Sequence, residues 1–138
     1  MHGFKGERTL LRIHIGEGDR YHGKPLYQAI VEVLRQQHYA GATVLRGIAG
    51  FGASAKLHTD RIEVLSLDLP VIIECVETGE RIAEILPLLD DMIGGGLITL
   101  ERAKAIMYRA DLPDDQRTAS WPVDITGVQS RTEPDGGR

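Results

Sequence analysis

The 138-residue sequence has only one cysteine, no long apolar run and no strong excess of either charge. The single thiol, Cys75, excludes an internal disulfide and favours a reducing compartment. No segment approaches the length of a membrane span, and the first residues mix charges with apolar side chains, unlike a signal peptide. We therefore expect a cytoplasmic protein. The mild net charge of −4 argues against a nucleic-acid partner.

The composition is that of one globular domain followed by a tail. Hydrophobic residues make up 42% and charged residues 26% of the chain, which is ordinary for a folded domain. Residues 111–138 are instead rich in proline, glycine and charge, with no apolar period. We expect a domain over residues 1–110 and a disordered tail over 111–138, in which Trp121 is incidental.

Apolar periodicity predicts a strand and then a helix in the first third of the chain. Residues 8–16 alternate as in a half-buried strand. One face of this strand carries Leu11, Ile13 and Ile15, and the other carries Leu10, Arg12 and His14. A loop is expected over residues 16–25, with Pro25 at the first position of a helix. The helix has one apolar face, Leu26, Ala29, Ile30, Val33 and Leu34, and Gly41 is its natural stop.

A second set of elements follows. Residues 42–49 predict a strand, residues 62–67 hint at extended chain, and the β-branched run over 70–76 predicts another strand. Thr78 suits the N-cap of a second helix, in which Pro87 predicts a kink or break near residues 83–87. A strand begins at Leu97. Residues 101–109 favour helix by propensity and strand if they pair at a sheet edge.

The resulting order, β-α-β, loop, β-α-β, predicts an α+β fold: the ferredoxin-like βαββαβ two-layer sandwich. Two functions known on this fold are disfavoured by residues that the chain lacks. RNA-recognition domains stack bases on aromatics of the central strands, and residues 8–15 and 70–76 contain none. Acylphosphatases use an asparagine to orient water, and the sequence contains no asparagine.

Two glycine clusters are candidates for ligand binding. The segment Gly50-Phe51-Gly52-Ala53 opens a match to the dinucleotide fingerprint G-x-G-x-x-G/A, but no helical pattern follows it, as that motif requires. A P-loop also fails, because Ala53 replaces the lysine. The glycines are then either a bend of the chain or a place where a ligand approaches closely.

The second cluster, Gly94, Gly95 and Gly96, is either a flexible helix end or a nest of backbone N–H groups that holds a phosphate. Nothing in the spacing alone brings the two clusters together.

The remaining reactive side chains predict neither a metal site nor a catalytic set. The five histidines lack the i, i+4 spacing of a zinc site. His14 fits a polar outer face or a subunit interface. Cys75, in an apolar strand, is most simply a small buried hydrophobe.

Four segments in order resemble a known family: RGIAGFG (46–52), AKLHT (55–59), LPVIIE (69–74) and MIGGGLIT (92–99). Over about residues 5–109 the chain resembles the PII-like proteins of domain-of-unknown-function family 190. The resemblance implies a homotrimer with nucleotides bound in the clefts between subunits, and it favours strand over residues 101–109. It also suggests a membrane transporter or a fluoride channel as partner.

On this interpretation no cofactor is required, and an adenine nucleotide is the ligand. The site consists of Gly50, Phe51, Gly52, Ala53, Lys56, Arg61, Gly94, Gly95 and Gly96, in which Lys56 and Arg61 supply positive charge. The loop after residue 52 is short, and Leu97 stands where a lysine is expected, so a mononucleotide such as AMP fits better than a triphosphate. The function expected is that of a non-enzymatic sensor. The alternatives are a small enzyme that uses His14 or His58, and a structural trimer without ligand.

Overall fold

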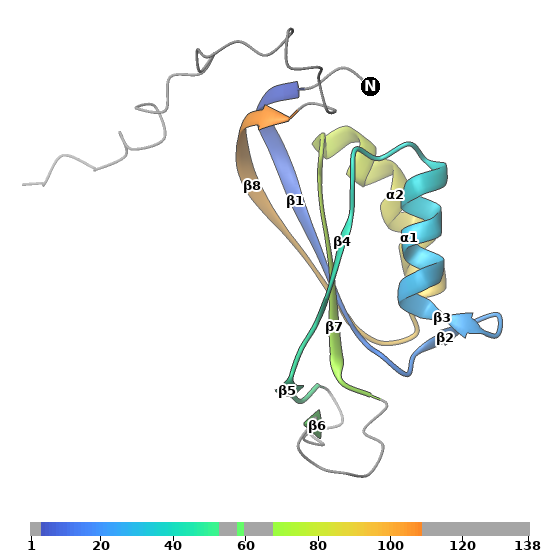
Figure 1. The fold of residues 1–138 in the computed structure, drawn as a ribbon. Coiled ribbons are helices and arrows are strands. Elements are labelled where there is room, and N and C mark those ends of the chain that lie inside the picture. Colours follow the sequence, from blue (N-terminus) through green and yellow to red (C-terminus); the bar gives the residue numbers. More distant parts are fainter. Residues whose placement is uncertain (1–3, 53–57, 60–67, 109–138) are drawn as a thin grey trace, which may run out of the picture. The chain divides into compact units, whose positions relative to one another are not determined.

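The computed structural model describes residues 4–52, 58–59 and 68–108 (Figure 1). The chain forms two units, which we treat separately. Residues 8–103 form one unit, which contains both helices and the sheet discussed below. The second unit holds residues 1–7 and 104–138, of which the described parts are the first residues of one strand and the last residues of another.

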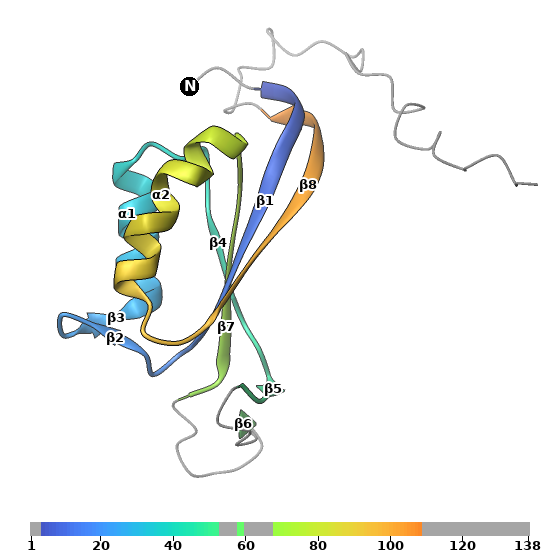
Figure 2. The same ribbon diagram turned by 180° about the vertical axis from the view of Figure 1, so that it is seen from behind.

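An antiparallel sheet of four strands is the main element of the fold. Its strands, in spatial order, are β4 (Thr43–Arg46), β7 (Pro70–Glu77), β1 (Phe4–Gly16) and β8 (Leu97–Tyr108). The helices α1 (Leu26–Gln36) and α2 (Gly79–Met92) cover one face of the sheet (Figures 1 and 2). The ferredoxin-like βαββαβ prediction is therefore confirmed, and residues 101–108 are strand.

The core lies between the helices and the covered face of the sheet. The predicted inner face of β1 is fully or nearly fully buried, as is Cys75 on β7. The predicted face of α1 is buried except for Val33, which is partly buried. The opposite face of β1, which carries Leu10, Arg12 and His14, stays partly exposed, as the alternation predicts.

Helix α1 ends earlier than Gly41, and the residue that ends it is a histidine. His38 takes the left-handed conformation, with φ of 58°. The N–H of Tyr39 donates to the carbonyl of Leu34 at 3.0 Å, and the N–H of His38 donates to that of Arg35 at 3.0 Å. This is the Schellman motif, which satisfies carbonyls at the helix end without a glycine.

The predicted strand over residues 42–49 is interrupted at Gly47 and Ile48. Beyond β4 the chain forms a separate short strand, β5 (Ala49–Gly50), which pairs with β6 (His58–Thr59). At the interruption the N–H of Gly47 donates to the carbonyl of Pro70 at 2.7 Å. A Cβ atom on Gly47 would lie only 2.7 Å from Cγ of Pro70, so a residue with a side chain would be pushed away from β7.

The predicted loop over residues 16–25 contains a small hairpin. Strands β2 (Arg20–Tyr21) and β3 (Lys24–Pro25) pair through a two-residue turn. His22 and Gly23, at its centre, both have positive φ, as the hairpin turn of type I′ requires. Histidine is not a typical residue for this position, so the turn could not be predicted from its residue types.

Helix α2 begins as predicted and continues through Pro87. The side chain of Thr78 accepts a hydrogen bond from the N–H of Arg81 at 3.3 Å, as an N-cap does. One helix spans Gly79–Met92, so of the kink or break expected near residues 83–87 the break does not occur. Pro87 and Ala83 are both exposed, so water can bond the Ala83 carbonyl that proline leaves without a donor.

Several expectations fall outside the described residues. These are the extended chain over 62–67, the character of the tail over 111–138 and the role of Trp121. Within the described ranges, no helix is long and apolar enough to cross a membrane.

Candidate functional site

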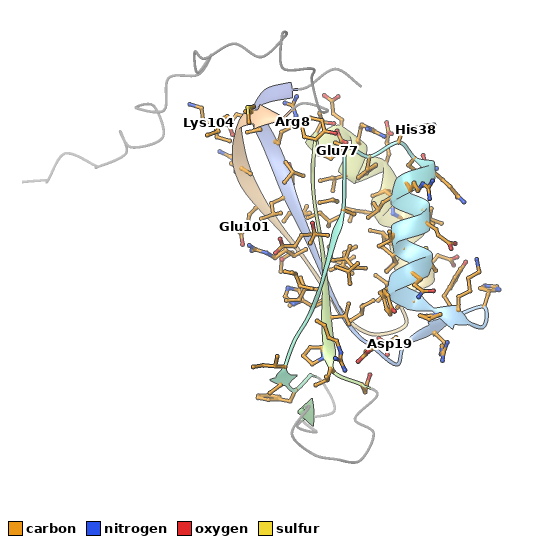
Figure 3. All side chains as sticks on the ribbon, viewed as in Figure 1. Arg8, Asp19, His38, Glu77, Glu101 and Lys104 are labelled. Atoms are coloured by element: carbon orange, nitrogen blue, oxygen red, sulfur yellow. The ribbon has the colours of Figure 1, made fainter. Side chains whose placement is uncertain are left out.

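A cleft of about 550 Å³ opens where β1 ends and where β7 and β8 begin. Figure 3 labels Asp19, which lies at this end of the sheet, just beyond β1. The cleft is lined by His14, Ile15, Gly16, Asp19, Gly50, Phe51, Gly52, Asp68, Pro70, Gly95, Gly96 and Leu97.

Both predicted glycine clusters contribute to this one cleft. Gly50, Phe51 and Gly52 come from the chain after β4, and Gly95 and Gly96 come from the turn between α2 and β8. Gly94 is not among the lining residues. Ala53, Lys56 and Arg61 lie outside the described residues.

Strand order explains how the clusters meet. The first cluster follows β4 and the second precedes β8, and these strands are the two edges of the sheet. They are three interstrand spacings apart, or about 14 Å. The ends of β7 and β1 lie between them, where Pro70 pairs with Gly16. Each cluster reaches one of these inner strands, because Gly50 lies against Pro70 of β7 and Gly96 lies against His14 of β1.

The cleft glycines fall into two kinds. A Cβ atom on Gly96 would lie 2.6 Å from the backbone oxygen of His14, and one on Gly50 would lie 2.9 Å from Cγ of Pro70. These two glycines are required by packing within the protein. Among the described residues, a Cβ atom on Gly52 or Gly95 would meet nothing within 4 Å. At these two positions a side chain would instead occupy the open space into which a ligand would fit.

Two carboxylates that belong to no sequence motif also line the cleft. Oδ2 of Asp19 accepts a hydrogen bond from the N–H of Gly16 at 2.9 Å, and Oδ1 of Asp68 accepts one from the N–H of Gly18 at 3.3 Å. The N–H of Glu17 donates to the carbonyl of Leu69 at 2.8 Å, which fastens this loop to the start of β7. The sequence GEGD after the first strand was a signal for such a turn, because Asp often bonds nearby backbone.

The described lining of the cleft carries acidic groups and a histidine. Among the described residues that line it, the ionisable side chains are His14, Asp19 and Asp68, with no lysine or arginine. In the same ranges, no three His, Cys, Asp or Glu residues are grouped so as to hold a metal ion. This part of the cleft thus offers hydrogen-bond acceptors and apolar surface rather than a cationic seat for several phosphates.

The sheet face beside the cleft, opposite the helices, carries an ion-pair network. Nε of Arg12 lies 2.9 Å from Oε1 of Glu74, and its Nη1 lies 2.7 Å from Oε1 of Glu101. The hydrogen bond to Glu74 and the charge of Glu101 raise the pKa of the Arg12 guanidinium. The network joins strands β7, β1 and β8 across a face that no helix covers.

The fold is that of the PII-like proteins. Two solved structures of CPII, a nitrogen regulatory PII-like protein from Thiomonas intermedia K12 bound to ADP, AMP and bicarbonate, share it with TM-scores of 0.53. One of them is 12% identical in sequence, and the match covers 75% of this chain and 90% of the CPII chain. The other is 10% identical, and the match covers 76% of this chain and 99% of the CPII chain. At these identities the likeness concerns the fold alone.

Sequence comparison defines the family within that fold. The model of the DUF190 family (Uncharacterized ACR, COG1993) matches residues 8–105, and the chain belongs to this family. A UPF0166 protein of Methanocaldococcus jannaschii is 41% identical over 92 residues, which is 66% of this chain and 84% of that protein. A UPF0166 protein of Aquifex aeolicus is 34% identical over 102 residues, which is 72% of this chain and 94% of that protein.

Proposed function

We propose that this protein is a non-enzymatic PII-like regulator that binds an adenine nucleotide in the cleft described above. The observation that carries the proposal is the meeting of the two glycine clusters, more than forty residues apart in sequence, in one cleft. Open glycine positions and apolar surface beside polar groups are what a nucleotide requires. The PII-like neighbours bound to ADP and AMP support this choice of ligand.

The ligand best matched to the cleft is a mononucleotide such as AMP. Asp19 and Leu97 line the cleft, and neither carries the positive charge that a triphosphate would need. In this proposal Lys56 and Arg61 bring the positive charge for one phosphate. In this proposal the bound ligand also contacts His58, and a partner protein would then meet a different surface. A membrane transporter or channel is the partner that the family resemblance suggests.

We further propose that the cleft lies between subunits of a homotrimer. The uncovered sheet face carries Leu10, Ile72 and Val76 beside the Arg12 network, and a bare sheet face of this kind is usually buried by association. Light scattering at micromolar concentration should then give three times the chain mass of 15.2 kDa. The mass of a single chain would contradict the trimer.

Calorimetry with AMP, ADP and ATP tests the ligand. We expect AMP to bind with a Kd below about 1 mM, which corresponds to roughly −4 kcal/mol. Lys56→Ala should weaken binding only modestly, because a single partly solvated charge contributes little. Mass spectrometry of any small molecule that co-purifies with the protein provides an independent check. If none of the three nucleotides binds below 1 mM, the nucleotide proposal is wrong.

One observation favours a second candidate, a small enzyme. His14 lines the same cleft as Asp19 and Asp68, so an acid-base group is available beside two carboxylates. Incubation with each nucleotide, followed by chromatography, distinguishes the two functions. A regulator returns the ligand unchanged, whereas an enzyme forms a product at a rate that His14→Gln should reduce.

A further inference from the structure

Phe51 is the cleft residue whose exposure the fold itself leaves unexplained. Its side chain lines the cleft and is 73% exposed. It contributes nothing to the hydrophobic core, and the residues on both sides of it are glycines. Within the described part of the chain, a Cβ atom on Gly52 would meet nothing within 4 Å, so no described residue fills the space next to Gly52.

The surroundings of Phe51 suit a flat aromatic ligand group. The ring of Pro70 packs against Gly50, and Ile15 and Leu97 provide further apolar lining. A purine base has two apolar faces and a polar edge, and aromatic side chains stack on such faces. The carboxylates of Asp19 and Asp68 supply acceptors for amino or hydroxyl groups of the same ligand.

We propose that Phe51 is the stacking platform for the nucleotide base, and that it is the residue through which the cleft selects a nucleotide over a sugar phosphate. This inference rests on the proposed function and adds to it the orientation of the ligand. The base lies against Phe51, on the β4 side of the cleft. The phosphate then lies away from the ring, toward the turn at Gly95 and Gly96.

The chain offers a closely matched control. Ile48 lies three residues earlier on the same segment and is 75% exposed, yet it does not line the cleft. Truncating Ile48 or Phe51 to alanine removes a large exposed apolar side chain in each case. Neither change opens a cavity in the core, so both variants should fold. Any difference between them in ligand binding reports the position of the ring.

Calorimetry on Phe51→Ala, Ile48→Ala and the unmodified protein, with AMP and with ribose 5-phosphate, tests the inference. Base stacking predicts that Phe51→Ala weakens AMP binding about 5- to 150-fold and leaves ribose 5-phosphate within about twofold. Ile48→Ala should leave both unchanged. Phe51→Leu, which keeps apolar bulk without an aromatic face, should lose most of the affinity that Phe51→Ala loses.

A fluorescence experiment provides a readout that a structural role would not change. In a Trp121→Phe background, Phe51→Trp places the only tryptophan in the cleft. AMP should quench its emission and ribose 5-phosphate should not, because only the base can stack. Absence of quenching under saturating AMP would overturn the stacking role.

The remaining outcomes separate this inference from the proposed function. AMP binding that Phe51→Ala and Ile48→Ala affect equally overturns the role of Phe51 and leaves the nucleotide proposal intact. A loss of AMP affinity in His14→Ala but not in Phe51→Ala would also overturn the role of Phe51 and leave the nucleotide proposal intact. In that case the base would stack on His14, which carries the other aromatic ring of the described lining. A change in molar mass with Phe51→Ala would make Phe51 an interface residue, and failure of the unmodified protein to bind AMP would overturn both proposals.

Discussion

The hydroxyl of Tyr39 donates a hydrogen bond to the carbonyl of Arg81 at 2.8 Å, and the guanidinium of Arg81 lies 4.7 Å from the centre of the Tyr39 ring. Nη1 of Arg81 also lies 3.0 Å from Oε2 of Glu77 and donates to the carbonyl of His38 at 3.3 Å. Its Nη2 donates to the carbonyl of Gln37. One side chain at the start of α2 thus holds the end of α1, near His38 and Glu77 in Figure 3.

Arg81→Ala should lower the free energy of unfolding by about 2–3 kcal/mol. Glu77 is only 3% exposed, so the substitution removes a cation from beside a buried carboxylate. Urea unfolding measures the loss, and Arg35→Ala, on the exposed side of α1, should cost less than about 0.5 kcal/mol. The double variant Arg81→Ala with Glu77→Gln should recover part of the loss. A double variant no more stable than Arg81→Ala would contradict the pairing.

Stability should fall at alkaline pH because of Cys75. Burial, with a further contribution from the charge of Glu77, raises the pKa of the Cys75 thiol from 9.0 to about 12. The folded state therefore favours the neutral thiol, and this stabilisation is complete below pH 9 and lost as the pH rises toward 12.

We expect a loss of at most about 1.4 kcal/mol per pH unit between pH 9 and 12 from this group, measured by urea unfolding at each pH. Cys75→Ala should be less stable at pH 7, because it leaves a small cavity, but its stability should depend less on pH over that interval. Ellman's reagent at pH 8 should react with Cys75 only after unfolding. Rapid reaction in the folded protein would show that the thiol is accessible.

Those elements that depend on local pattern were predictable from the sequence. The alternation of residues 8–16 and the single apolar face of residues 26–34 each fix which side chains are buried, whatever the strand order. Residues 101–108 were not predictable locally. Their propensity favours helix, and it is pairing with β1 at the sheet edge that makes them strand.

The candidate site was predictable only in pieces. Each glycine cluster is visible in the sequence, but their meeting depends on β7 and β1 lying between β4 and β8, which no local pattern encodes. The carboxylates of Asp19 and Asp68 were missed for the same reason, since they reach the cleft from loops at different strand ends. His38 was missed because the left-handed position at a helix end is usually occupied by glycine.

Asp19→Asn should change the preference among nucleotides. The amide keeps an oxygen that can accept from the N–H of Gly16 but removes a negative charge from the cleft lining. We expect ATP to bind about 2- to 5-fold more tightly, and AMP to change less, because repulsion grows with the charge of the ligand. Asp90→Asn, on the exposed side of α2, is the charge-matched control. Equal effects of the two variants in calorimetry would assign the change to net charge alone.

The three consecutive glycines before β8 should give three different results when substituted. A side chain at Gly96 meets the backbone oxygen of His14, which cannot move without disturbing β1, so Gly96→Ala should cost about 1–3 kcal/mol of stability. At Gly95 a side chain enters open space within the cleft, so Gly95→Val should preserve stability and molar mass but abolish AMP binding. Gly94→Ala, with open space outside the cleft lining, should change neither stability nor binding. Thermal unfolding, light scattering and calorimetry on the three variants separate these effects. If Gly95→Val binds AMP as tightly as the unmodified protein does, this turn does not contact the nucleotide, and the second glycine cluster serves only to turn the chain from α2 into β8.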